Sequence, residues 1–387
     1  MIYLDNSATT KQHPSVTRRM ITCMEENYGN PSSLHRMGLE AEKAVKQARR
    51  ELSDAAGMPG MQVCFTSGGT ESDNMAIFGA AKAGRRQGRR IVTTAVEHPA
   101  VLECSQMLSG EGFDIVRIGV DRQGRLDLAQ AEEAIDGDTI LVTMMQVNNE
   151  VGTIFPVDEI ARIIREKNAP ALLHCDAVQS FGKIPLPAHA DLIAVSGHKI
   201  HGPKGSGALL IRKGLHLPAF IRGGGQESGL RSGTENVPAI AGLGEAASLC
   251  AKDREQRMKK VSQMRNLLMK GLLEEVEEVR INSPEETGEE AGTCCGSLLS
   301  VSFLGTRGEV ILHTLEQDGI CVSTGSACSS NKKGRSHVLQ AMGASDREIE
   351  GTIRFSLSQY NTEDEIIETI GRTAEAVKRF RRLGSFR

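Results

Sequence analysis

Short apolar runs alternate with amphipathic runs over the first two thirds of the chain. Five runs are nearly all apolar and rich in β-forming residues, and they lie at residues 90–96, 139–147, 171–178, 191–197 and 207–212. Such runs predict strands that are buried on both faces, as in a largely parallel sheet. Residues 73–84 and 158–168 instead space their apolar side chains as an amphipathic helix does. This alternation predicts an α/β domain in which helices flank the sheet.

The pattern changes after about residue 235. A long amphipathic helical stretch is expected over residues 236–278, followed by an acidic, exposed loop at 283–293. The remaining runs predict strands at 297–305, 319–325 and 352–358 and a final helix at 363–382. Because these elements do not alternate strictly, they predict a smaller α+β domain. We therefore expect a large domain of residues 15–255 and a small domain that combines residues 1–14 with residues 256–387.

The composition excludes several classes of protein. The 387 residues carry a formal net charge of −3, which offers no basic field for nucleic acid or for an anionic membrane. The first residues, "MIYLDNSATTKQ", lack the charged and apolar regions of a signal peptide, and no run approaches the roughly 18 apolar residues of a membrane span. These features predict a soluble cytoplasmic protein of two or three domains.

The nine cysteines are scattered and include no CxxC pair, so neither a disulfide framework nor a structural zinc site is expected. Most of them lie in apolar surroundings typical of small core residues. Cys328 differs, because the surrounding "STGSACSSNKKGRS" is small and polar and lacks helical periodicity. Nearby cations, Lys332, Lys333 and Arg335, favour ionisation of its thiol. On these grounds alone, a reactive thiol and an incidental exposed thiol remain equal alternatives.

Polar groups follow each of five predicted strands, namely the short run "QVCF" at residues 62–65 and the runs at 90–96, 139–147, 171–178 and 191–197. In chain order they are "TSGGTES", the pair Glu97-His98, the triplet Asn148-Asn149-Glu150, Asp176 with Gln179, and "SGHK" ending in Lys199. Ligands of open α/β sheets bind outside the carboxyl ends of the strands, so we expect these groups to share one site. Each group also has an ordinary alternative as a helix cap, a turn former or a solvated side chain. Together they supply a phosphate-binding helix start, an imidazole, an amide, a carboxylate and an amine, which fits pyridoxal phosphate (PLP).

Ten segments extend this pattern over nearly the whole chain, among them "YLDNSATT", "FTSGGTES", "EHPAV", "DAVQS", "SGHKIHGPKGSGAL" and "STGSACSS". In these segments and in their order the sequence resembles the cysteine desulfurases of the NifS/IscS-like family, within the class V aminotransferase group of fold-type-I PLP enzymes. The resemblance implies a large PLP-binding domain with a mostly parallel sheet and a smaller domain that carries a catalytic cysteine loop. One departure is Ser228, where the family often has arginine.

The resemblance also implies how the cofactor is held. Lys199 would bond covalently to the aldehyde of PLP, Asp176 would pair with the ring nitrogen, and His98 would stack on the ring and carry protons. Asn149 and Gln179 would contact the side of the ring that carries the hydroxyl. The phosphate would be held by Gly69, Thr70, Ser196 and His198.

Substrate contacts and a subunit partner follow from the same resemblance. Arg354 would bind the carboxylate of L-cysteine as a bidentate partner, and Asn6 and Asn30 would line the substrate site. Thr234 would reach the phosphate held by a second copy of the chain, which implies a homodimer. His201 is expected to be structural.

Within the family pattern Cys328 is the nucleophile. Its thiolate would take the sulfur of L-cysteine as a persulfide and leave L-alanine. The persulfide would pass to a sulfur acceptor, either an iron–sulfur scaffold protein, a tRNA-thiolating enzyme or both. No intrinsic metal is expected, although Cys328 could serve as a transient ligand of an iron–sulfur cluster together with a scaffold partner. No direct nucleic-acid or membrane contact is expected.

Three alternatives remain. An aminotransferase or a selenocysteine lyase would use the same cofactor, but an aminotransferase needs no thiol, so the cysteine segment favours desulfuration. A sulfur-relay scaffold with little turnover is disfavoured because Lys199, Asp176 and Cys328 are all present. A nucleotide-binding enzyme that uses "TSGGTES" would lack the GK[ST] ending of a P-loop.

Overall fold

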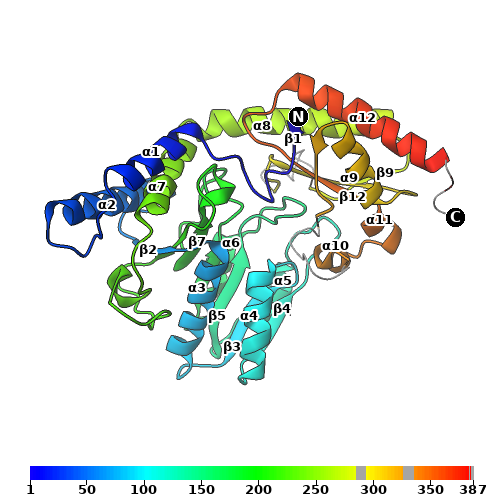
Figure 1. Ribbon diagram of the computed structural model, residues 1–387. Coiled ribbons are helices and arrows are strands. Elements are labelled where there is room, and N and C mark those ends of the chain that lie inside the picture. Colours follow the sequence, from blue (N-terminus) through cyan, green and yellow to red (C-terminus); the bar gives the residue numbers. More distant parts are fainter. Residues whose placement is uncertain (285–292, 326–334, 383, 385–387) are drawn as a thin grey trace.

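The chain folds around a seven-stranded mixed sheet with helices on both faces (Figure 1). The computed structural model describes residues 1–284, 293–325, 335–382 and 384. The strands of this sheet lie in the order β2 (Gln62–Thr66), β8 (Gly207–Ile211), β7 (Leu192–Ser196), β6 (Leu172–Asp176), β5 (Thr139–Met145), β3 (Arg90–Thr94) and β4 (Asp114–Ile118). β8 is antiparallel to both of its neighbours, and the other six strands run in one direction.

Successive residues of each strand bury opposite faces of the sheet. Ile91 and Leu141 belong to one apolar layer, which α3 (Gly69–Gly84) and α4 (Pro99–Gly110) cover. The next residues along the same strands, Val92 and Val142, belong to the layer on the other face. That second layer is completed by α2 (Arg36–Ala56), α6 (Val157–Glu166) and α7 (Val237–Ala251). On the outside, α1 (Pro14–Glu25) packs on α7, and α5 (Leu128–Ala134) packs on β4.

A smaller assembly of strands and helices has its own apolar core. It holds the antiparallel sheet β12 (Thr352–Ser356), β10 (Leu298–Phe303), β9 (Val279–Ile281) and the parallel pair β1 (Ile2–Tyr3) with β11 (Ile320–Cys321). Its helices are α8 (Arg254–Glu275), α9 (Gly308–Gln317) and α12 (Glu363–Arg382). Nearby, α11 (Asp346–Glu350) packs on β10, whereas Val338 and Leu339 of α10 (His337–Ala341) belong to the core of the large sheet. The first strand and the last helix of the chain both belong to this part (Figure 1).

The α/β fold with a mostly parallel sheet is confirmed, and two details differ from the sequence expectation. The helical stretch predicted over residues 236–278 is wrong as one element, because α7 ends at Ala251 and α8 begins at Arg254. Between them Asp253 adopts φ 51°, a left-handed conformation that interrupts an α-helix. The strand predicted at 319–325 is reduced to Ile320 and Cys321.

Two further expectations concern the acidic segment and membrane-spanning helices, and the structure addresses them only for the residues that it describes. Most of the acidic segment predicted as an exposed loop, residues 285–292, lies outside them. Within the described residues no helix is long and apolar enough to cross a membrane. The division into domains at residues 14 and 255 stays a prediction.

Candidate active site

A cavity of about 190 Å³ opens at the carboxyl edge of the large sheet. The ends of β2, β3, β5, β6 and β7 all contribute to its wall, because these strands run in one direction. Its lining includes the strand-end residues predicted to share a site: Gly69, Thr70, His98, Asn149, Asp176, Gln179, Ser196, His198 and Lys199. The N-terminal residues Ser7 and Ala8 complete one side.

Lys199 enters the cavity from the short 3₁₀ turn Gly197–Lys199 (η1) that directly follows β7. The turn requires glycine at position 197, because a Cβ there would lie 2.4 Å from Ser206 Oγ. The Lys199 Nζ atom donates to the carbonyl oxygen of Ser7 and, at 2.9 Å, to that of Ala8. The chain therefore holds a primary amine at the cavity wall against two backbone carbonyls.

Asp176 ends β6 and is only 6% exposed. Its Oδ1 atom accepts a hydrogen bond of 2.9 Å from the backbone N–H of Val178, which fixes the carboxylate in place. Burial raises the pKa of Asp176, while the nearby charge of Lys199 acts in the opposite direction. A positively charged group bound beside it would favour the ionised carboxylate further.

His98 is both the N-cap of α4 and part of the cavity wall. Pro99 begins the helix, where its fixed φ is favourable, and His98 Nδ1 accepts from the Ala100 N–H at 3.1 Å. Burial and the charge of Lys199 lower the pKa of His98 to about 4. The ring is therefore neutral near pH 7, and because Nδ1 accepts, its proton lies on Nε2.

The start of α3 forms a cradle suited to an anion. No side chain caps this helix, because its N-cap is Gly68, so its first N–H groups are open to a ligand. Gly69 lies so close to the loop after β6 that a Cβ there would be 2.5 Å from Val178 Cγ2. Ser196 and His198 lie on the same wall, and His198 Nδ1 is 3.2 Å from Thr9 Oγ1. Burial lowers the pKa of His198 to about 4.

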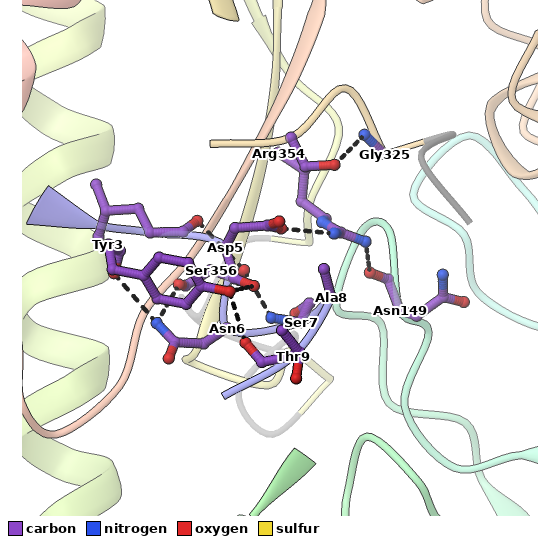
Figure 2. Close-up of polar contacts among 12 residues, drawn as sticks. Tyr3, Asp5, Asn6, Ser7, Ala8, Thr9, Asn149, Gly325, Arg354 and Ser356 are labelled. Carbon is purple, nitrogen blue, oxygen red and sulfur yellow. Dashed lines mark hydrogen bonds and ion pairs between the residues drawn. The ribbon is translucent and has the colours of Figure 1, made fainter. Parts of the chain in front are cut away.

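Arg354 lies on β12 and is not among the residues that line this cavity. Its guanidinium donates through Nη1 to the carbonyl of the lining residue Asn149 at 2.9 Å and through Nη2 to Asp5 Oδ1 at 3.0 Å (Figure 2). The residue is fully buried, and among the described residues its Nε has no hydrogen-bond partner. The arrangement joins the N-terminal segment, the loop after β5 and β12 at one buried cation.

The other predicted site residues lie away from the cavity lining. Asn6 lines an adjoining cavity of about 50 Å³ that also touches Lys199, and its Nδ2 donates to the Ser356 carbonyl at 2.9 Å. Asn30 is exposed in the loop between α1 and α2, where its Oδ1 accepts from the Ser32 N–H at 2.9 Å. Thr234 is exposed on the segment before α7. Their predicted contacts with substrate or with a second subunit remain predictions.

Cys328, Ser228 and His201 are three other positions named from the sequence, and of these Ser228 and His201 do not line the larger cavity. Cys328 lies outside the described residues, so its assignment remains a prediction. Ser228 is exposed, in the turn Glu227–Gly229, with φ 58°. His201 Nδ1 lies 2.9 Å from the Lys11 carbonyl, which fits the structural role expected for it.

The sequence did not point to several residues of the cavity. Ser7 and Ala8 contribute backbone carbonyls, which carry no signal in residue type. Asp73 lines the cavity from α3 at 1% exposure, and its Oδ1 is 3.5 Å from Nε2 of the buried His174. An acidic residue inside the apolar run at 73–84 was the available signal. Within the described residues, no cluster of histidine, cysteine and acidic side chains could hold a metal ion.

Comparison with known proteins places this fold and site in a class. Residues 2–368 match the family model described as "Aminotransferase class-V". A solved structure described as a "NifS-like protein" superposes with a TM-score of 0.89 at 39% identity, covering 97% of this chain and 99% of that chain. Another, described as "SspA in complex with cysteine", gives a TM-score of 0.79 at 32% identity and covers 94% of this chain and all of that one (100%).

Among proteins of assigned function, a "Cysteine desulfurase" of Nostoc sp. is 43% identical over 390 residues, covering 100% of this chain and 95% of the relative. The chain thus belongs to the class V aminotransferases and, within them, to the cysteine desulfurases. The family predicted from the sequence is confirmed.

Proposed function

We propose that the cavity binds PLP and that the protein removes sulfur from L-cysteine. The observation that carries this proposal is the enclosure of the Lys199 amine and the Asp176 carboxylate in one cavity beside the uncapped start of α3. These groups match an aldehyde, a ring nitrogen and a phosphate respectively. The missing side chain at Gly69 leaves the helix start accessible. When bound, PLP supplies an electron sink that labilises bonds at the α- and β-carbons of the substrate.

The residues of the chain would then share the remaining work. Lys199, whose amine lines the cavity, would take the proton from the substrate α-carbon. His98 is neutral and presents an N–H at Nε2, so it can donate a hydrogen bond to the departing product. To carry a proton to that product, the ring must first take one up, and we assign it this role of proton carrier. Arg354 supplies a guanidinium for the substrate carboxylate, which would displace the present contact with Asp5.

Sulfur transfer needs a nucleophile, and we assign it to Cys328. Its thiolate attacks the sulfur of L-cysteine, so that a sulfur–sulfur bond forms while the carbon–sulfur bond breaks. The electron pair of the broken bond stays with the β-carbon, which is protonated to give L-alanine. L-cysteine and the thiol thus give L-alanine and a persulfide, with no external oxidant. The solved relative described in complex with cysteine supports this choice of substrate.

The direct test is to give L-cysteine to the protein loaded with PLP and no thiol acceptor. We expect one persulfide per chain and an equal amount of L-alanine in the first turnover. Chromatography of the products and mass spectrometry of the protein measure both. Conversion of the cofactor to its amine form without L-alanine would instead support the aminotransferase alternative.

The acceptor of the persulfide is proposed by chemistry alone. An iron–sulfur scaffold protein and a tRNA-thiolating enzyme both consume sulfur at the persulfide level, and either would take it from Cys328. Direct contact with nucleic acid or a membrane is not proposed. The cytoplasmic location remains a prediction from the sequence.

We propose that the working unit is a homodimer. Large apolar side chains are exposed on α1, on the loop that follows it and on α2. They are Ile21, Met24, Tyr28, Leu34 and Leu39, and Leu34 is 96% exposed. An exposed apolar patch of this kind marks an interaction surface. The segment that carries the exposed Thr234 is tied to the first turn of α3 by a 2.9 Å ion pair between Arg231 and Glu71. Thr234 itself does not line the cavity of its own chain, which leaves it available to the phosphate bound by a second copy.

The homodimer can be tested with two kinds of variant. Leu34→Glu combined with Tyr28→Glu is expected to give monomers in sedimentation velocity and to weaken PLP binding. Thr234→Val is expected to remain dimeric and to weaken PLP binding about tenfold, the cost of one hydrogen bond to a charged group. A monomer with full activity would contradict the proposal.

A further inference from the structure

The side-chain amide of Gln179 is held at both of its polar atoms. Gln179 lies after β6, is 5% exposed and lines the cavity. Its Nε2 donates to the Ser7 carbonyl at 3.0 Å, and its Oε1 accepts from Lys183 Nζ at 3.2 Å. The Ser7 carbonyl also accepts from Lys199 Nζ. Lys183, Gln179, Ser7 and Lys199 therefore form one continuous hydrogen-bonded chain along the wall.

Lys183 and the Ser7 carbonyl together determine the orientation of the Gln179 side-chain amide. The ammonium group of Lys183 can only donate, and the carbonyl of Ser7 can only accept. A flipped amide would place its NH₂ group against the ammonium and its oxygen against the carbonyl, and it would lose both hydrogen bonds. In the observed orientation, one of the two N–H groups on Nε2 binds Ser7, and the other is left for a ligand in the cavity.

Lys183 itself stands behind the cavity wall. It lies in the loop between β6 and β7 and lines the adjoining cavity of about 50 Å³, but it is not among the lining residues of the larger cavity. Burial lowers the pKa of Lys183. Burying a lysine without a partner costs free energy of folding. The hydrogen bond to Gln179 Oε1 therefore helps to stabilise Lys183 in this position.

We propose that Lys183 is a positioning residue that fixes the amide of Gln179 so that it presents an N–H donor, not an oxygen, to an oxygen acceptor on the bound cofactor. This inference rests on the proposed binding of PLP, with Gln179 on the side of the ring hydroxyl as the resemblance implies, so that the hydroxyl oxygen would be the acceptor. A donor there stabilises the anionic form of the hydroxyl. Without Lys183 only the Ser7 carbonyl still orients the amide, so the flipped orientation becomes more accessible and the anionic form loses its donor for part of the time.

The readout is the pH midpoint at which the visible absorption band of the bound cofactor changes. Lys183→Met removes the donor and keeps much of the volume, and it is expected to raise this midpoint by about one pH unit, the effect of one hydrogen bond. Lys183→Arg keeps a donor-only cation and is expected to leave the midpoint within a few tenths of the wild-type value. Lys183→Gln can donate or accept, and it is expected to lie between the two, which provides a second test if the methionine variant does not fold.

A double replacement separates positioning from a direct effect of the charge. In a Gln179→Ala background, Lys183→Met is expected to cause no further shift, because there is no amide left to orient. A full additional shift in that background would overturn the inference, and so would an unchanged midpoint in both the methionine and the glutamine variants. If the wild-type protein shows no visible band with PLP, the proposed function fails first. A wild-type band with no effect of Lys183 refutes only this inference.

Discussion

Replacing Lys199 with alanine is expected to lower the rate of L-alanine production from L-cysteine by about 10⁴-fold or more. Among the described residues that line the cavity, Lys199 is the only lysine. Its replacement removes the amine that bonds to the cofactor and the base that takes the α-proton. Treatment with borohydride should fix PLP irreversibly to the wild-type chain and leave it dialysable from the variant, as peptide mass spectrometry would show.

Lys204 offers a matched control for this replacement. It lies five positions further along the same loop and is exposed, and it does not line the cavity. Lys204→Ala should therefore retain both the borohydride-fixed cofactor and the activity. A covalent adduct that persists in the Lys199→Ala chain would remove Lys199 from its proposed role.

Replacing Cys328 with serine is expected to lower L-alanine production by on the order of 10³-fold and to abolish the persulfide. The reason is that no other atom in the proposed reaction accepts the sulfur. PLP binding and its attachment to Lys199 should be unchanged, since neither needs a protein thiol. Incubation with L-cysteine, alkylation, digestion and mass spectrometry would locate the added sulfur.

The control for this experiment is Cys321→Ser. Among the described cysteines Cys321 alone is partly exposed, and the other seven are buried. Burial raises the pKa of Cys64, Cys104 and Cys250 to about 12, which keeps their thiols protonated. Cys321→Ser should accumulate as much persulfide as wild type. If the sulfur is found mainly on a cysteine other than Cys328, the assignment of the nucleophile is wrong.

The wall of the cavity could be predicted from the sequence because it follows from the strands. An apolar run marks where a strand lies, and the polar residue at its end marks the edge it reaches. Asp176 and Lys199 end up in one cavity because β6 and β7 are adjacent and parallel. No knowledge of the packing between strands was needed to place them.

Other parts of the site depend on contacts that no local pattern records. The carbonyls of Ser7 and Ala8 reach Lys199 from about 190 positions away, and every residue has such a carbonyl. Arg354 is identifiable as a cation, but its contact with Asp5 arises only when β12 and the N-terminal segment meet. The break between α7 and α8 at Asp253 could not be predicted from a glycine or a proline, because neither residue type occurs there. The contact proposed for Thr234 needs a second chain, so a single chain does not display it.

The pairing of β1 with β11 has a consequence for how the protein is made. Ile2 lies opposite Ile320, and Asp5 bridges to Ser356, so the segment that holds Ile2 and Asp5 binds residues that are synthesised more than 300 positions later. At about 5–20 residues per second, the N-terminal segment waits roughly 15–70 s for its partners. During translation the large sheet can form while Lys199 still lacks the carbonyls of Ser7 and Ala8. The complete wall therefore closes only after β11 and β12 have been synthesised, and a nascent chain truncated before β11 should bind PLP more weakly than a chain that contains both strands.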